Sequence, residues 1–125
     1  MEGGHFLVAR RNPGGSQGGK WEFPGGKLEP GETAEQALAR EFAEELSIPV
    51  AVGRRLFEGS FRNGAKTYRL EAWQTTLLGR DFRLTEHQEI RWVAPDQLRN
   101  LDLSDSDRQV AEALLKAVES PSSYR

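Results

Sequence analysis

The sequence contains no cysteine, and histidine occurs only twice in its 125 residues. Disulfides and thiolate-bound zinc are therefore excluded, and a histidine-rich metal site is not expected. There is no apolar run of the ~18 residues that a membrane-spanning helix needs, and no signal peptide is visible. Basic charge is not in excess, because 17 Lys and Arg face 19 Asp and Glu, for a formal net charge of −2. These absences predict a cytoplasmic protein that binds neither a membrane nor a nucleic-acid backbone.

Length and composition are those of one soluble domain. With 37% hydrophobic and 29% charged residues, the chain matches an ordinary globular protein. A chain of 125 residues can bury one sizeable core, and no internal repeat or linker divides it. We therefore expect a single domain that spans residues 1–125.

The segment 34–46 is predicted to be a helix, because it contains no Gly, Pro or β-branched residue and can be capped by Thr33 or Glu32. On that helix Glu41, Glu44 and Glu45 stand at i, i+3 and i+4, so their carboxylates share one face. Like charges at this spacing destabilise a bare helix, and a cation is expected to compensate. Mg²⁺ or Mn²⁺, which prefer oxygen ligands, are the natural candidates.

The spacing of this helix extends upstream to a loop. Gly26 is followed by five residues, Glu32, seven residues and then Arg40-Glu41-Phe42-Ala43-Glu44-Glu45-Leu46-Ser47-Ile48. This resembles the Nudix box, G-x5-E-x7-R-E-U-x-E-E-x-G-U, in which U is a bulky aliphatic residue. The lead-in Trp21-Glu22-Phe23-Pro24-Gly25-Gly26 is similar to that of the MutT-like branch.

Two positions of the box depart from the pattern. Phe42 stands at the first aliphatic position, and Ser47 stands where the box has Gly. The family's Gly ends the helix in the left-handed conformation, so we expect Ser47 to adopt it at a cost of roughly 1 kcal/mol.

The resemblance implies an α/β protein, the Nudix α/β/α sandwich with a mixed sheet between helices. Family members usually begin with a strand before the one predicted at residues 5–11, but here only Met1–Gly4 precede it. Strand 5–11 is therefore expected to leave a sheet edge open or to pair with another element.

The remaining elements follow from local patterns. They are strand 50–61 with a kink at Gly53, a hairpin turn at Asn63-Gly64, strand 66–77, a short strand 89–93 closed by Pro95, and a helix from Ser104 or Ser106 to about residue 118.

The resemblance also implies roles for the residues of the box. Glu44 and Glu45 are the expected principal metal ligands, and Glu41 is expected to be a ligand or the general base. Arg40 would hold Glu41 in place, while Glu32 would steady the junction between loop and helix. The sequence does not divide the roles of the three helix carboxylates.

Further metal contacts are expected outside the helix. A backbone carbonyl at Gly25 or Gly26 could join the metal shell, because Mg²⁺ accepts carbonyl oxygen. Glu86 is the candidate for an additional carboxylate ligand, with Glu89 as its competitor. His87 is expected to be a surface or structural residue.

Four positions are candidates for binding a nucleotide. Arg11, or its neighbour Arg10, could reach a phosphate with its planar fork of donors, and Lys27 could also touch phosphate. Phe23 could line the base pocket. Asp107 falls where MutT-like enzymes read the base edge, and a carboxylate there favours an exocyclic amine such as cytosine N4 or guanine N2. The alternative is that Asp107 only stabilises its helix, because a negative charge in the first turn interacts favourably with the helix dipole.

Taken together, these residues predict Mg²⁺-dependent hydrolysis of a nucleoside triphosphate to monophosphate and pyrophosphate. The MutT-like lead-in favours cleansing of the nucleotide pool, with 8-oxo-dGTP as the first substrate to consider and CTP or a modified dCTP as the second. A dinucleoside polyphosphate or nucleotide-sugar substrate is a further alternative. A non-catalytic nucleotide-sensing module is disfavoured by the intact carboxylate set. Oligomeric state is not indicated.

Overall fold

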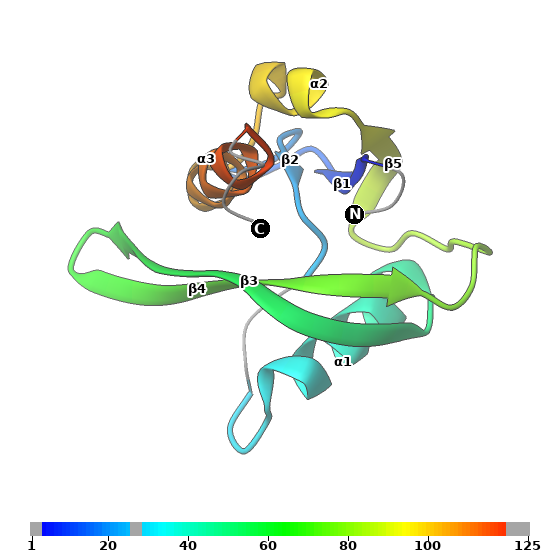
Figure 1. Cartoon of the computed structure of the whole chain (residues 1–125). Helices are drawn as coiled ribbons and strands as arrows, with labels where there is room; N and C mark the ends of the chain where they lie inside the picture. Colours follow the sequence, from blue (N-terminus) through cyan, green and yellow to red (C-terminus); the bar gives the residue numbers. More distant parts are fainter. Residues whose placement is uncertain (1–3, 26–28, 120–125) are drawn as a thin grey trace.

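The computed structural model describes residues 4–25 and 29–119 (Figure 1). The described elements, in chain order, are β1 (Phe6–Arg11), β2 (Trp21–Glu22), α1 (Ala34–Leu46), β3 (Val50–Asn63), β4 (Lys66–Leu77), β5 (His87–Val93), α2 (Pro95–Asn100) and α3 (Asp105–Glu119). In this part of the chain, β1 lies between β2 and β5 in one sheet, and β3 pairs with β4 in a long hairpin. The predicted α/β class is confirmed.

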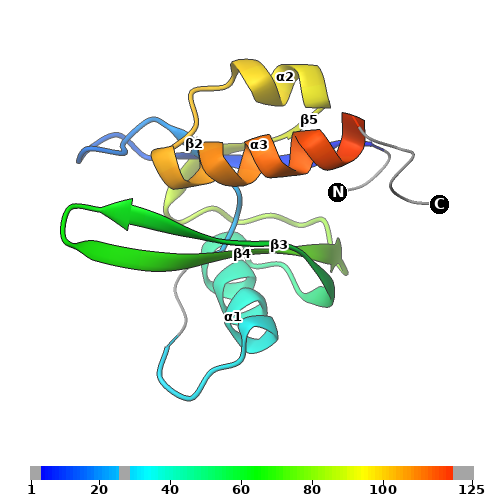
Figure 2. The same cartoon turned by 60° about the vertical axis from the view of Figure 1, so that its left-hand side comes forward.

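Strand β1 lies at the centre of the fold, and both of its faces are buried. Alternation along the strand sends Phe6 and Val8 to a core formed with α2 and α3, and sends Leu7 to a second core formed with α1 and β4. Figures 1 and 2 accordingly show α2 and α1 on opposite sides of the molecule, with the strands between them. This arrangement is a sandwich of helices around strands.

Of the two alternatives expected for residues 5–11, pairing with another element is observed: β5 pairs along the whole of β1, and β2 pairs with Ala9 and Arg10 on the other side. Ala9 is opposite Glu22 of β2, and Phe6 is opposite Val93 of β5, both in antiparallel register. Within the described residues, the β3–β4 hairpin forms a second sheet, which packs between α1 and α3. Parallel pairing in this part of the chain is confined to an isolated bridge between Trp21 and Leu103.

Helix α1 begins and ends as its sequence predicts. Thr33 is the N-cap, and its hydroxyl accepts a hydrogen bond from the Gln36 amide while the Gln36 side chain accepts one from the Thr33 amide. Ser47 has φ 58° and ψ 35°, the left-handed conformation, and its amide donates to the carbonyl of Ala43. Pro49 follows and prevents the helix from continuing.

Three boundaries differ from the prediction. The hairpin turn occupies Gly64 and Ala65, so Asn63 is the last residue of β3. Strand β5 begins at His87 rather than at residue 89. Pro95 does close the strand, but it is also the first residue of α2, a helix that was not predicted; Pro is well suited to this position because its missing N–H would have no helical partner.

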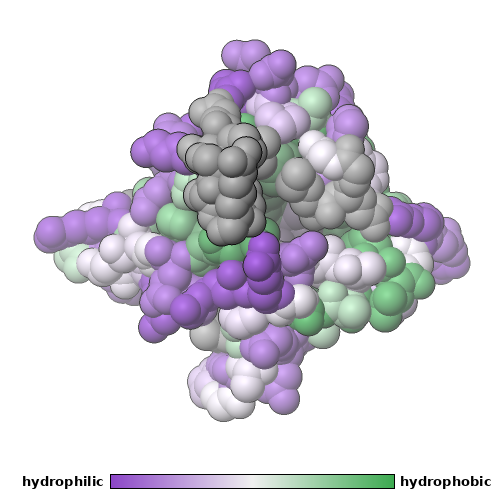
Figure 3. Space-filling view, in the orientation of Figure 1, coloured by the Kyte–Doolittle hydropathy of each residue, from purple (hydrophilic) through white to green (hydrophobic). Residues whose placement is uncertain are grey.

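The face seen in Figure 3 is largely hydrophilic, with apolar areas between polar ones. Among the described residues, the large apolar residues that remain exposed are Leu56 and Leu78, at 43% and 62%. In residues 4–25 and 29–119, no helix combines the length and the apolar character that a membrane crossing demands.

Candidate active site

Arg40 joins the loop before α1 to the carboxylates of the helix. Its Nε and Nη2 donate to the two oxygens of Glu32 at 2.7 and 3.0 Å, and its Nη1 donates to Glu41 at 2.6 Å and to Glu44 at 3.3 Å. Glu32 also accepts from the amide of Glu29. The bond from Arg40 lowers the pKa of Glu32, and the same pairing raises the pKa of Arg40. The guanidinium of Arg40 thereby holds the loop and the helix together through charge-assisted hydrogen bonds.

The helix glutamates have different environments although they share one face. The side chain of Glu44 is 60% exposed, that of Glu41 is 16% exposed, and that of Glu45 is only 5% exposed. Arg40 therefore balances the outer two charges, whereas Glu45 points into the protein. The compensation expected for these acids is supplied in part by this arginine.

Glu45 carries the strongest electrostatic perturbation of these glutamates. Burial raises its pKa to about 8, assisted by a hydrogen bond with Glu41 and by the negative charges of Glu41, Glu22 and Glu86. Its Oε1 atom is buried and has no hydrogen-bond partner among the described residues. A buried carboxylate in an acidic surrounding is the environment in which a bound divalent cation stabilises the ionised form.

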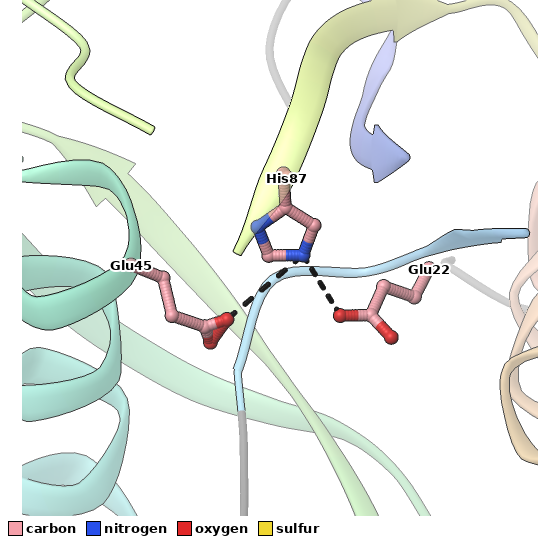
Figure 4. Close-up of side chains that lie close together, drawn as sticks. All are labelled: Glu22, Glu45 and His87. Carbon is pink, nitrogen blue, oxygen red and sulfur yellow. Dashed lines mark hydrogen bonds and ion pairs between the residues drawn. The ribbon is translucent and has the colours of Figure 1, made fainter. Parts of the chain in front are cut away.

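Two residues that sequence reasoning did not assign to the site complete this environment. His87 of β5 and Glu22 of β2 lie beside Glu45 (Figure 4). The Nε2 atom of His87 is 2.9 Å from Glu22 Oε2 and 4.0 Å from Glu45 Oε2. The three side chains form a group that could hold a metal ion. Of the two alternatives expected for His87, surface or structural, the surface position is excluded, because its side chain is fully buried.

The segment that carries Glu86 is tied to the end of β1 and to α1. The amide of Asn12 donates to the carbonyl of Glu86, and the hydroxyl of Thr85 donates to the carbonyl of Glu44. Glu86 is one of the charges that raise the pKa of Glu45. Glu89 instead pairs with Arg91 at 3.3 Å and lies 3.9 Å from Arg10. Of these two acids, Glu86 is the one placed toward Glu45.

Of the loop before α1, the structure describes Gly25 and leaves Gly26 and Lys27 outside the described residues. Gly25 has φ 142°, a value that favours glycine, and it lies against Leu38 of α1. The backbone at Gly25 is thus adjacent to the helix that carries the carboxylates.

The candidate phosphate-binding arginines already have protein partners. Arg11 Nη1 donates to Glu22 Oε1 at 3.2 Å, so Glu22 lies between Arg11 and His87. Arg10 donates to the carbonyl of Gly19. Arg11 is the one connected to the buried acidic group.

The two candidate base-binding residues touch each other. Asp107 accepts from the amide of Phe23 at 3.2 Å and from the hydroxyl of Ser104 at 2.5 Å. Burial raises the pKa of Asp107 to about 6. Phe23 stacks edge-to-face on Phe6, with ring centroids 6.3 Å apart. Asp107 therefore joins the start of α3 to the loop after β2, whatever else it binds.

Two hollows on the described surface lie away from this site. One of about 570 Å³ is lined by hairpin residues such as Glu58 and Arg69, and one of about 390 Å³ is lined by residues of α2 and α3, Arg99 and Arg108 among them. Neither of these two hollows is lined by the carboxylates of α1.

Comparison with known proteins agrees with this geometry. The NUDIX domain family matches residues 1–114. The chain belongs to the Nudix family. The prediction of a Nudix hydrolase of the MutT-like kind, with the Nudix α/β fold, is confirmed.

Two relatives and one solved structure are reported for comparison. A Mycobacterium tuberculosis protein named as a candidate 8-oxo-dGTP diphosphatase 2 is 40% identical over 111 residues, 86% of this chain and 77% of its own length. The CTP pyrophosphohydrolase of Escherichia coli is 34% identical over 112 residues, 90% of this chain and 83% of its own. The solution structure of the E. coli ORF135 protein superposes with a TM-score of 0.79 at 32% identity, covering 93% of this chain and 83% of that one.

Proposed function

We propose that this Nudix protein hydrolyses a nucleoside triphosphate to the monophosphate and pyrophosphate, with Mg²⁺ or Mn²⁺ bound at Glu41, Glu44, Glu45 and Glu86. The observation that carries the proposal is the environment of Glu45, a buried acid on a helix, with the carboxylates of Glu41, Glu22 and Glu86 around it. Its orphaned Oε1 atom and the oxygen-rich donor set fit a hard divalent ion. When bound, such an ion neutralises phosphate charge and activates water.

The protein's own residues have distinct tasks in this scheme. Arg40 fixes Glu32, Glu41 and Glu44 so that the helix carboxylates do not have to reorganise during the reaction. Glu41, which shares the helix face with Glu45, is a candidate to accept a proton from the attacking water or to act as a ligand. Carbonyls at Gly25 and Gly26 are further candidates for ligands.

The nucleotide would be held outside this centre. Arg11, at the end of β1, is positioned to contact a phosphate, and Lys27 remains a second candidate. Phe23 and Asp107 would meet the base. Asp107 accepts two hydrogen bonds from the protein but keeps further lone pairs for an exocyclic amine. A free nucleotide as substrate agrees with a cytoplasmic protein that needs no nucleic-acid or membrane partner.

An oxidised nucleotide such as 8-oxo-dGTP is the first substrate we propose, and CTP or a modified dCTP is the second. The names of the two relatives described above support each in turn. Both bases carry an amine that a carboxylate at position 107 could accept from. A dinucleoside polyphosphate or a nucleotide sugar lacks such support from these relatives.

A substrate panel with Mg²⁺ tests the proposal. The panel contains dGTP, 8-oxo-dGTP, CTP, dCTP, a dinucleoside tetraphosphate and a nucleotide sugar, and pyrophosphate is measured separately from phosphate. We expect pyrophosphate from a triphosphate, with the highest kcat/KM for 8-oxo-dGTP or a cytidine nucleotide. Release of phosphate alone, or binding of nucleotides without turnover, would contradict the proposal.

A further inference from the structure

Atoms from three separate elements converge beside the carboxylates of the proposed function. Glu22 comes from β2, Glu45 from α1 and His87 from β5, and their ligand atoms all lie within 4.8 Å of one another (Figure 4). The two oxygens flank one nitrogen, since His87 Nε2 lies 2.9 Å from Glu22 Oε2 and 4.0 Å from Glu45 Oε2. The group therefore offers one nitrogen and two oxygens to a common centre.

This group is buried and incompletely satisfied. The side chains of Glu45 and His87 are 5% and 0% exposed. Among the described residues, neither Glu45 Oε1 nor His87 Nδ1 has a hydrogen-bond partner. In the ion-free protein Nε2–H donates to Glu22 Oε2, because a carboxylate oxygen only accepts. A cation bound between the carboxylates would replace this proton, and Nδ1 would carry the ring hydrogen instead. Buried polar atoms of this kind call for a missing partner.

The charges around the group favour a cation. Glu41 and Glu86 also act on Glu45, so the group is surrounded by acids. Arg11 binds Glu22, but through Oε1, the oxygen that faces away from His87. The positive charge supplied by Arg11 thus meets the outer side of Glu22, and the side shared with His87 and Glu45 is left to another cation.

The distances suit a coordination shell. With metal–ligand bonds of about 2.1 Å, adjacent donors of an octahedron lie about 3 Å apart and opposite donors about 4.2 Å apart. The observed separations of 2.9 and 4.0 Å are close to these two values. An imidazole nitrogen in the shell favours transition ions over Mg²⁺, which prefers oxygen ligands throughout.

We propose that Glu22, Glu45 and His87 form a mixed oxygen and nitrogen site for a divalent transition ion such as Mn²⁺. The inference rests on the proposed function in one respect, because Glu45 is shared with the metal centre proposed there. Glu22 and His87 are the new ligands, and they make the centre selective among divalent ions. Arg11 holds Glu22 in the orientation that the ion needs.

The chain allows a direct spectroscopic test because it contains only two histidines. Untagged protein is loaded with one equivalent of Mn²⁺, and electron spin-echo envelope modulation is recorded with natural-abundance histidine and with ¹⁵N-labelled histidine. We expect modulation from a directly bound ¹⁴N nucleus that is replaced by the ¹⁵N pattern on labelling. His5→Gln should retain this signal and His87→Gln should abolish it. Gln at position 87 can still donate to Glu22, so the fold is preserved.

Ion affinities give a second measurement. His87→Gln and Glu22→Gln should each weaken Mn²⁺ binding by about tenfold or more, while Mg²⁺ binding changes much less in His87→Gln. Mn²⁺ bound without coupling to histidine, or no Mn²⁺ binding, would overturn the proposed site. An intact histidine coupling in a protein that hydrolyses no nucleotide would contradict the proposed function and leave the ion site standing.

Discussion

Arg40 binds Glu32 through two nearly parallel hydrogen bonds, Nε to Oε2 at 2.7 Å and Nη2 to Oε1 at 3.0 Å. The remaining nitrogen of the same guanidinium, Nη1, reaches Glu41. One side chain therefore fixes both the loop before α1 and the carboxylate of Glu41 on the helix. A lysine could not do this, because its single ammonium lacks the planar fork.

We expect Arg40→Lys to lower kcat by about tenfold or more, as for other residues that orient metal ligands, with a smaller effect on KM. Arg40→Gln and Glu32→Gln should each produce a comparable loss, and the double variant should lose little more than either single one. Steady-state kinetics on the preferred nucleotide supply the comparison. Losses that multiply in the double variant would show that the two residues act independently.

Ser47→Gly should raise the free energy of unfolding by up to about 1 kcal/mol, because Gly adopts the left-handed conformation without steric cost. Ala43→Gly, at an exposed position inside the same helix, should lower it by about 1 kcal/mol and serves as the control for a new glycine. Urea unfolding of the two variants measures both effects. A Ser47→Gly protein that is less stable than the wild type would argue against strain at this cap.

Elements that depend on neighbouring residues were predictable from the sequence. Thr33 and Ser47 mark the ends of α1 through local capping rules, and the hairpin follows from Gly64. Glu22 and His87 were missed because their meeting depends on long-range pairing of β2 and β5 with β1. A two-residue strand is too short to show the alternation of buried and exposed side chains that marks a strand. In the structure Trp21 is buried, so its neighbour Glu22 faces the opposite side of β2.

The burial of Glu45 also lay beyond sequence reasoning. Spacing places Glu41, Glu44 and Glu45 on one face, but it does not show which of them the neighbouring elements cover. That depends on β5, which begins at His87 rather than two residues later. Whether Asp107 reads a base or only anchors α3 likewise depends on its contact with Phe23, 84 residues away.

Asp107→Asn should flatten part of the pH dependence of stability. Burial raises the pKa of Asp107 from 3.8 to about 6, so the folded protein binds this proton more tightly than the unfolded chain. The carboxyl stabilises the fold fully below about pH 4, and this contribution is lost as the pH rises through about 6. Relative to Asp107→Asn, the wild type should lose up to about 3 kcal/mol over that interval.

Urea unfolding between pH 4 and 7 measures this difference, with the exposed neighbour Asp105→Asn as the control for a lost charge in the same helix turn. Asn can keep both contacts, because its oxygen accepts from the Phe23 amide and its NH₂ donates to Ser104. Parallel stability curves for the wild type and Asp107→Asn would contradict the raised pKa.

The same position tests base selection. We expect Asp107→Ala to lower kcat/KM by about one to two decades for the preferred nucleotide, because the base amine loses its acceptor. The effect on UTP, which lacks that amine, should be far smaller, and Mg²⁺ dependence should not change. Comparison at a pH where the variant is shown to be folded separates recognition from stability. Equal losses on every base would mean that Asp107 only anchors α3.

Pyrophosphate release by Glu45→Gln, compared with the wild type and with Glu35→Gln, tests the central claim most directly. Both variants remove one negative charge from α1, but Glu35 is exposed in the first turn whereas Glu45 is buried among acids. At saturating Mg²⁺, turnover should still require the buried carboxylate of Glu45. Glu45→Gln should lose orders of magnitude in kcat while remaining folded, and Glu35→Gln should keep nearly full activity. Near-normal turnover in Glu45→Gln would contradict the claim that this buried carboxylate is the centre of a metal-dependent hydrolase.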